Sequence, residues 1–413
     1  MRHIFFLHYK IIHGVRTIFL CFLKSSFKLS THNDYSSVLK SLKPIYEVKW
    51  QNSPSQPFNT LPPFEVTCGE SVISENKQPA VKPANYFIKD ISFSEDGAYL
   101  VVLTSTKDFY IYSTDNFTLI CKHQLPRAAS KVVFSFDSQL VLVADKTGDV
   151  LIYKTKDQSD PGKKVFGHLS LLTDILMTRD NKYIITCDRD EKIKVSNYPG
   201  SYNIEAFCLG HREFITSIHF LPHNEKYLVS ASGDGTVRIW EYLLGKELVV
   251  INVHGEANKS GVFDNFKQVM KIEDVEIDCL PVDYASCCKL EDNSSLLAVS
   301  LHLNKSVVIY KITGEGSVME YKCVHNVPLE DCPAGFVVLK DRLLVHLSGD
   351  KQQLQEWKLK DDGMVENGFC EVFEEDNTKR DAEGDKISVL YKRKFDNLQE
   401  YQNRKKKRIE SQK

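Results

Sequence analysis

Two sets of histidine, hydroxyl and aspartate residues are the first candidates for chemistry in this chain. A histidine beside an aspartate could transfer a proton or bind a metal ion. The same residue types can instead satisfy one another's hydrogen bonds when a fold buries them together. In both sets the histidine directly follows a glycine, and the other residues come later at similar spacings. The sets are His211, Ser230, Asp234 and Trp240, and His168, Thr186 and Asp190, with Ser196 where the second set lacks a tryptophan.

A second candidate is a segment in which nearly every residue carries a charge. It lies between two short apolar runs and contains Asp188, Arg189, Asp190, Glu191, Lys192 and Lys194. This position predicts a tight turn between strands, on a rim of the fold where charged side chains can reach a partner. A solvated hairpin tip without a partner is the alternative.

Motifs typical of catalysis are missing from the sequence. It has no phosphate-binding loop, dinucleotide fingerprint, nucleophile elbow or His-Glu-x-x-His motif. The eleven cysteines include no C-x-x-C pair, which predicts reduced thiols in an intracellular protein rather than disulfides or zinc ligands. We therefore expect this chain alone to have no catalytic activity, metal site or cofactor.

The elements that position both candidates are strands in a regular repeat. A short apolar strand that ends on an aromatic residue recurs roughly every 40–45 residues, which is the period of a β-propeller blade. Gly, Pro, Asn and Asp separate the strands within each repeat, as hairpin turns require. The closing strands are Phe109–Tyr112, Val150–Tyr153, Ile193–Ser196 (with serine for the aromatic), Val237–Trp240, Val307–Tyr310 and Leu354–Trp357.

These repeats predict an all-β, seven-bladed propeller over residues 41–390. Ile45–Trp50 would close a further blade, and strands from both ends of the domain would seal the ring. The spacing between Trp240 and Tyr310 leaves room for an insertion at about 255–285.

Three local features are expected within and after the propeller. Lys267–Lys271 is predicted to be helical, and the acidic stretch at about 361–386 is predicted to be a mobile loop after a turn at Asp361–Gly363. Residues 388–401 are expected to resume as a strand and then a helix.

The two ends of the chain differ from its middle. Residues 1–40 fit no blade and are expected to be a disordered leader or a non-native extension, with a targeting segment as the alternative. Ile18–Leu23 is too short to span a membrane, so no membrane association is expected. Residues 391–413 form a basic tail with a predicted short helix. Its run of Arg404, Lys405, Lys406, Lys407 and Arg408 fits either a nuclear import signal or nucleic-acid contact.

The repeat that ends on Trp240 resembles the WD-repeat family. In that family a histidine after glycine, a serine or threonine, an aspartate and a tryptophan hydrogen-bond one another within a blade. His211, Ser230, Asp234 and Trp240 match all four places, whereas His168, Thr186 and Asp190 match three. The resemblance implies that both sets are structural tetrads that hold the blades together.

The chain is also similar to the non-catalytic WD-repeat subunit of tRNA (guanine-N7-)-methyltransferase. The similarity is clear over about residues 87–245 and returns at 390–401. It rests on Val143–Val150, Gly167–Ser170, Asp188–Ser196, Phe207–His211, Ser232–Thr236 with Trp240–Tyr242, and Leu390–Lys392 with Phe395–Asn397.

This resemblance implies a heterodimer. The catalytic partner would carry S-adenosylmethionine and form 7-methylguanosine in tRNA, and this chain would stabilise that partner in the nucleus, with the cytoplasm as a further location. Arg189, Lys192 and Lys194 would pair with acidic residues of the partner, while Asp188 and Glu191 would shape the same partner-binding turn. Lys194→Glu is then expected to weaken the complex without unfolding the propeller. The basic tail would contact tRNA if it is not an import signal.

Three other functions stay open at this stage. A general WD-repeat scaffold, such as a substrate receptor of a ubiquitin ligase, often carries arginine two residues after the tryptophan-aspartate pair, whereas this chain has Trp240-Glu241-Tyr242-Leu243. An enzyme would need titratable side chains that converge in the central channel. A second role beside tRNA modification, such as nuclear genome maintenance, is neither supported nor excluded by the residues.

Overall fold

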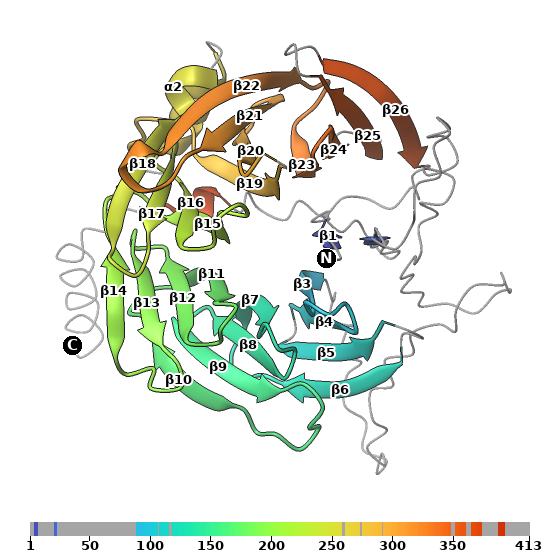
Figure 1. Ribbon diagram of the computed structural model, residues 1–413, viewed down its shortest axis with the longest axis vertical. Helices are drawn as coiled ribbons and strands as arrows, with labels where there is room; N and C mark the ends of the chain where they lie inside the picture. The colour runs from blue at the N-terminus through green and yellow to red at the C-terminus, as the bar shows by residue number, and fades with distance from the viewer. Residues whose placement is uncertain are drawn as a thin grey trace, which may run out of the picture.

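The described strands form a ring of antiparallel sheets in the computed structural model (Figure 1). The structure describes residues 4–6, 20–22, 88–105, 107–114, 118–257, 261–272, 275–290, 292–347, 352–360, 365–373 and 387–392. Six sheets of four strands each are present in these ranges, and we number them blades 1 to 6 in chain order. The predicted all-β propeller architecture is therefore confirmed. The expected further blade ending on Trp50 lies outside the described residues, so the count of seven stays a prediction.

Each blade uses four strands in the order in which the chain makes them. Blade 1 contains β3 (Ile88–Phe93), β4 (Tyr99–Thr104), β5 (Asp108–Ser113) and β6 (Leu119–Gln124). Blade 2 contains β7 (Ala129–Phe134), β8 (Leu140–Asp145), β9 (Asp149–Lys154) and β10 (Lys163–Gly167). Blade 3 contains β11 (Leu172–Met177), β12 (Tyr183–Asp188), β13 (Ile193–Asn197) and β14 (Ile204–Cys208).

The next three blades follow the same plan. Blade 4 contains β15 (Ile215–Phe220), β16 (Tyr227–Ser232), β17 (Thr236–Glu241) and β18 (Lys246–Asn252). Blade 5 contains β19 (Val282–Lys289), β20 (Ser295–Leu301), β21 (Ser306–Thr313) and β22 (Glu320–Pro328). Blade 6 contains β23 (Pro333–Val338), β24 (Arg342–Leu347), β25 (Gln352–Leu359) and β26 (Val365–Phe373).

The core lies between neighbouring blades. The first strand of each blade lines the centre of the ring and the fourth lies at its outer wall (Figure 1). Because adjacent blades cover both faces of the middle strands, those strands read as continuous buried runs, as in β16 and β20. Trp240 illustrates the packing, since it is fully buried in the cluster that joins blades 3 and 4.

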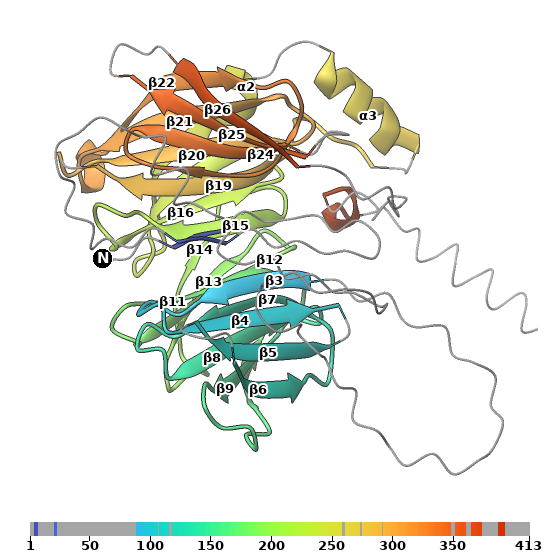
Figure 2. The same cartoon turned by 90° about the vertical axis from the view of Figure 1, so that its right-hand side faces the viewer.

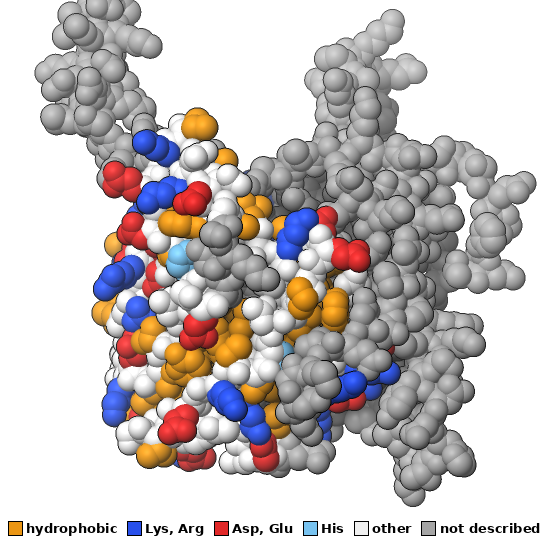
Figure 3. Space-filling model, turned by 90° about the horizontal axis from the view of Figure 1, so that it is seen from above, with side chains coloured by type: hydrophobic (Ala, Val, Ile, Leu, Met, Phe, Trp, Pro, Cys, Tyr) orange, Lys and Arg blue, Asp and Glu red, His pale blue; other side chains and the backbone are white. Residues whose placement is uncertain are grey.

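The outer wall is more polar than the middle of each blade. Strands such as β14 and β22 combine exposed and half-buried positions, as expected for the edge strand of a sheet. Acidic, basic and apolar side chains are interspersed over the described part of the wall visible in Figure 3.

The insertion between blades 4 and 5 contains two helices. Between β18 and β19 the chain forms α2 (Val253–Ala257) and α3 (Val262–Ile272), and α3 includes the segment predicted to be helical. A short 3-10 helix, η2 (Ser388–Leu390), lies on the same side of the ring as α3 (Figure 2).

Two local predictions near the C-terminus are wrong. The stretch expected to be an acidic loop contains β26, which pairs with β25 along its whole length. An outer strand has a free edge and gains most from backbone pairing, so it can tolerate the polar composition that suggested a loop. The strand expected to begin at residue 388 is replaced by η2.

The predictions for the two ends of the chain concern ranges of which the structure describes only a few residues. In the predicted leader the structure gives two short strands, β1 (Ile4–Phe6) and β2 (Leu20–Phe22), which pair antiparallel. The basic run 404–408 and the predicted tail helix lie outside the described residues.

Candidate functional site

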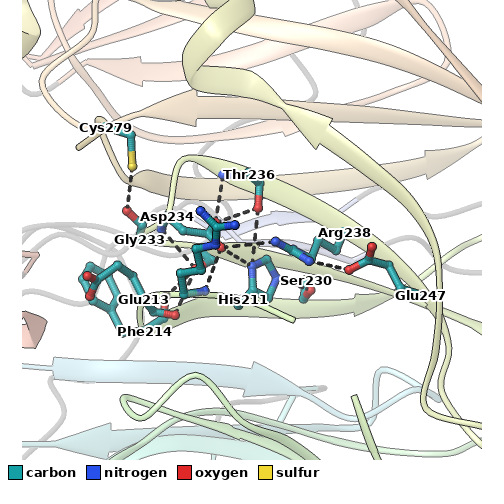
Figure 4. A network of polar contacts seen from close by, with 12 residues as sticks. His211, Glu213, Phe214, Ser230, Gly233, Asp234, Thr236, Arg238, Glu247 and Cys279 are labelled. Carbon is teal, nitrogen blue, oxygen red and sulfur yellow. Dashed lines mark hydrogen bonds and ion pairs between the residues drawn. The ribbon is translucent and has the colours of Figure 1, made fainter. Parts of the chain in front are cut away.

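The tetrad of blade 4 forms a continuous chain of hydrogen bonds (Figure 4). His211 Nδ1 lies 2.9 Å from Asp234 Oδ2, and His211 Nε2 lies 2.7 Å from Ser230 Oγ. Trp240 Nε1 donates to the same hydroxyl at 2.8 Å. Burial alone would raise the pKa of Asp234, but the hydrogen bonds from His211, from Thr236 and from the backbone N–H of Arg212, with the charge interaction with His211, together hold that pKa well below its usual value. All four predicted members are therefore joined, and they link the loop before β15 to β16 and β17.

The tetrad of blade 3 uses a different aspartate from the one predicted. His168 Nδ1 lies 2.8 Å from Asp188 Oδ2, and its Nε2 lies 2.7 Å from Thr186 Oγ1. Asp190, which has the sequence spacing of Asp234, is instead partly exposed on the rim. Ser196 is fully buried, and its hydroxyl has no hydrogen-bond partner. The chain of side-chain bonds in this blade thus stops short of the position that tryptophan occupies in blade 4.

Asp188 replaces Asp190 because it also caps the turn. Its Oδ1 accepts hydrogen bonds from the backbone N–H of Asp190 at 2.9 Å and of Lys192 at 3.0 Å. Asp145 holds the corresponding turn of blade 2 in the same way, through the N–H groups of Thr147 and Asp149. Sequence spacing did not predict this role of Asp188. Asp145 and Asp188 begin the turns of blades 2 and 3, whereas Asp234 lies in the middle of the turn of blade 4.

Neither histidine has a ring nitrogen left for other chemistry. Both nitrogens of His168 and of His211 contact tetrad partners, as the preceding distances show. Within the described ranges, no group of three or more His, Cys, Asp or Glu side chains could hold a metal ion. No helix in those ranges has the length and apolarity to cross a bilayer.

The charged segment forms the turn between β12 and β13, and we call Asp188–Lys192 the charged turn. Lys192 is exposed, and the Arg189 side chain is 39% exposed. Asp190 and Glu191 are each about one-third exposed, at 31% and 34%. The turn therefore presents both signs of charge at the rim, on a backbone fixed by Asp188.

Lys194 does not lie at the rim, and the expectation that it would is wrong. The residue is only 7% exposed, and its Nζ donates to the carbonyl oxygen of Gly167 at 2.8 Å. The ammonium also lies 4.6 Å from the ring centroid of Phe166. Burial lowers the pKa of Lys194, although the charge of Asp188 opposes this. The physical reason is position, because Lys194 lies inside β13, with strands paired on both sides of it.

A basic residue that the sequence did not single out contacts the charged turn instead. Lys392 Nζ lies 2.7 Å from Glu191 Oε1 and 3.6 Å from Asp190 Oδ1. The preceding Tyr391 is 4% exposed and packs edge-to-face on Phe214, with ring centroids 4.9 Å apart. We call Ile387–Lys392 the C-terminal clasp. The only signal for it in the sequence was the return of family resemblance at 390–392.

Glu213 lies in the same charged neighbourhood, in the loop before β15. Burial, followed by the negative charge of Glu191, raises the pKa of Glu213 to about 7, although the charge of Lys392 opposes the rise. Its neighbour Phe214 carries the ring on which Tyr391 packs. This loop thus joins the clasp, through the contact of Tyr391 with Phe214, to His211 of the tetrad. Figure 4 shows Glu213 and Phe214 near the tetrad residues His211 and Asp234.

Polar side chains on the inner strands connect neighbouring blades, which the sequence did not reveal. Asp90 Oδ2 accepts from the backbone N–H of Val132 in the next blade at 3.0 Å. Asp174 Oδ2 likewise accepts from Ile218 at 3.0 Å. These carboxylates are buried and their oxygens satisfy backbone donors, so they act as connections between blades. An enzyme would need titratable side chains near the central channel, and Asp90 and Asp174 are such residues. Their hydrogen bonds give them a structural role instead.

The blade order and the His–Ser–Asp–Trp tetrad define the class of protein as a WD-repeat β-propeller. Solved propellers share this fold. The structure titled "Crystal Structure of Mitotic Checkpoint Complex" has a chain with a TM-score of 0.52 and 13% identity, covering 68% of this chain and 80% of that one. The structure titled "Structure of U3-55K" gives a TM-score of 0.50 and 12% identity, over 70% and 83% of the two chains.

The particular family follows from sequence comparison, and the chain belongs to the tRNA methyltransferase TRM82 WD40 domain family. The family model matches residues 43–164 and 153–364. A relative from Drosophila mojavensis, named tRNA (guanine-N(7)-)-methyltransferase non-catalytic subunit wuho, is 31% identical over 360 residues, covering 85% of this chain and 90% of the relative. Relatives of the same name from Drosophila melanogaster and Culex quinquefasciatus are each 31% identical, over 79% and 78% of this chain and 75% of each relative.

Proposed function

We propose that this chain is the non-catalytic subunit of a tRNA guanine-N7 methyltransferase and forms a heterodimer with the catalytic subunit. Family membership and the names of the relatives support the subunit assignment. The catalytic partner binds S-adenosylmethionine and transfers the methyl group to guanine in tRNA. This chain supplies a rigid docking surface, consistent with histidines and carboxylates that are committed to holding the blades together.

The charged turn is the proposed docking surface. Its backbone is fixed by the bonds from Asp188, so Arg189 and Lys192 are presented without a large loss of loop entropy on binding. Both cations point from a rim of the propeller, where acidic residues of the catalytic subunit can pair with them. This single observation, exposed cations on an internally braced turn, carries the assignment of the interface. We leave Lys194 out of the proposed docking surface because its side chain is buried.

Apolar side chains flank these charges and supply the contact area that charges alone lack. Leu169 is fully exposed and Leu209 is 60% exposed, in the loops that follow β10 and β14. The loop of Leu169 lies beside the charged turn, because the N–H of Arg189 donates to the carbonyl of Leu171 at 2.9 Å. An apolar centre beside paired charges is typical of specific protein interfaces.

Two further parts of the proposal concern residues outside the described ranges. We place the heterodimer in the nucleus, with the cytoplasm as a further location, and propose the basic run 404–408 as an import signal or as a contact with tRNA phosphates. Phosphate contact by this run would make tRNA binding weaken steeply as salt is raised.

Co-expression with a tRNA guanine-N7 methyltransferase catalytic subunit, followed by methyl transfer to tRNA, tests the proposal. We expect wild type to co-purify with the catalytic subunit and support methylation. The double variant Arg189→Glu with Lys192→Glu reverses both charges. It should weaken binding by about 2–5 kcal/mol and abolish most methylation activity at low protein concentration. Lys182→Glu is the matched control, because this lysine is exposed at the opposite end of β12. Failure of wild type to bind would overturn the subunit assignment, and an effect of Lys182→Glu equal to that of the double variant would overturn the interface.

A further inference from the structure

The C-terminal clasp connects three separate parts of the molecule. Tyr391 packs on Phe214 of the loop before β15 and lies 6.3 Å, centroid to centroid, from Phe266 of α3. Ile387 and Tyr391 are both buried in the cluster shared by blades 4 and 5. Figure 2 shows η2, which precedes Tyr391, below α3 on the same side of the ring. The clasp is thus anchored by apolar contacts, and this anchoring delivers Lys392 to the charged turn.

Glu191, the residue that Lys392 pairs with, has an unfavourable backbone conformation. Its φ is +72°, in the left-handed region that residues with a Cβ seldom adopt. The corresponding positions in the flanking blades are glycines, Gly148 with φ +100° and Gly235 with φ +73°. Lys107, in the β4–β5 turn of blade 1, has φ +66°, so a residue with a Cβ is tolerated at such a turn at a cost in backbone energy, and Glu191 adds an ion pair with Lys392 that glycine could not make.

Lys392 also changes the charge of the docking surface. The exposed and half-exposed side chains of the turn are Arg189, Asp190, Glu191 and Lys192, whose formal charges cancel. The two carboxylates are the ones that Lys392 contacts. Asp190 Oδ1 also lies 4.0 Å from Arg189 Nε, so the turn already pairs one of its own cations. With Lys392 bound to the two carboxylates, the surface has a net positive charge.

We propose that the C-terminal clasp neutralises Glu191 and Asp190 and so makes the charged turn a net-positive dock for an acidic surface of the catalytic subunit. Lys392 is then a positioning residue, which acts through Glu191. This inference rests on the proposed function for the identity of the partner. The contact between clasp and turn belongs to this chain alone and can be tested separately.

The first test measures binding of the catalytic subunit to the full chain carrying Lys392→Gln. We expect an affinity about tenfold lower, with a similar thermal transition, because the removed ion pair is on the surface. Lys311→Gln is the matched control, since Lys311 makes a comparable ion pair with Asp292 in blade 5, at 2.5 Å. Equal affinity for wild type and Lys392→Gln would overturn the proposal while leaving the proposed function intact.

A double variant separates positioning from direct contact with the partner. In a Glu191→Gln background there is less charge for Lys392 to neutralise, so adding Lys392→Gln should change affinity by much less than it does in wild type. The same loss in both backgrounds would mean that Lys392 contacts the partner directly, which contradicts a role through Glu191.

Hydrogen exchange of the chain without its partner provides an independent readout. We expect amides of 387–392 and of the charged turn to exchange faster in Lys392→Gln than in wild type, and at wild-type rates in Lys311→Gln. Unchanged exchange in Lys392→Gln would overturn the clasp even if the complex forms. If Lys392→Gln exchanges faster than wild type but the wild-type chain binds no catalytic subunit, the clasp stands and the proposed function is rejected instead.

Discussion

Lys392 Nζ lies 2.7 Å from Glu191 Oε1, although the two residues are 201 positions apart in the chain. The contact brings the end of the described chain to a turn in the middle of the propeller. It also separates the roles of neighbouring charges, because Asp188 braces the turn from within, Glu191 holds the clasp, and Lys192 and part of Arg189 are exposed at the rim.

Lys194→Glu should destabilise the propeller, contrary to the expectation from sequence. The change removes a hydrogen bond to Gly167 and a cation–π contact with Phe166, and it buries a carboxylate near a carbonyl oxygen. We expect a loss of about 2–4 kcal/mol of unfolding free energy, measured by thermal or urea unfolding. Lys192→Glu, two residues away but exposed, should unfold like wild type and weaken the complex. Wild-type unfolding of Lys194→Glu would show that the buried contacts are unimportant.

Ser230→Ala and Ser196→Ala should differ in their effect on stability, although both serines are fully buried. Ser230 lies in β16 of blade 4 and Ser196 in β13 of blade 3. Ser230 Oγ contacts His211 and Trp240, so its removal leaves two buried groups unsatisfied, at a cost of about 1–3 kcal/mol. Ser196 Oγ has no partner, so its removal should be neutral or slightly stabilising. Urea midpoints of the two variants measure the difference, and equal midpoints would contradict the assigned roles.

Glu213 should make stability fall as the pH rises. Its pKa is about 7 in the folded chain against its usual value of 4.5, so over this range the folded state holds a proton that the unfolded state releases. The stabilisation is therefore complete below pH 4.5 and disappears as the pH rises through 7. Glu213→Gln should gain stability relative to wild type between pH 5 and pH 8, as followed by urea unfolding at each pH. A constant difference between the two proteins across this range would exclude the pKa shift.

The sequence predicted the blades because each one repeats a local pattern. Strands ending at Tyr112, Tyr153, Trp240 and Tyr310 alternate with turn residues, and local propensity alone places them. The tetrad of blade 4 could be assigned for the same reason, since its members have the family spacing.

The errors arose where tertiary contacts decide a residue's role. Asp190 has the spacing of Asp234, yet Asp188 takes the tetrad position because it also caps the turn. Lys194 looks like part of a charged run, but pairing of β13 on both sides buries it. The contact of Lys392 with Glu191 could not be predicted, because no local pattern links residues so distant in the chain.

The order of strands in the described blades has a consequence for biosynthesis. Every one of the six sheets is built from four consecutive strands, so each can pair as soon as its own segment leaves the ribosome. Contacts within a blade are local and form early, whereas the ion pair of Lys392 with Glu191 needs nearly the whole chain. A docking surface that depends on this late contact would be completed only after all six described blades have been synthesised, which would keep shorter nascent chains from capturing the catalytic subunit.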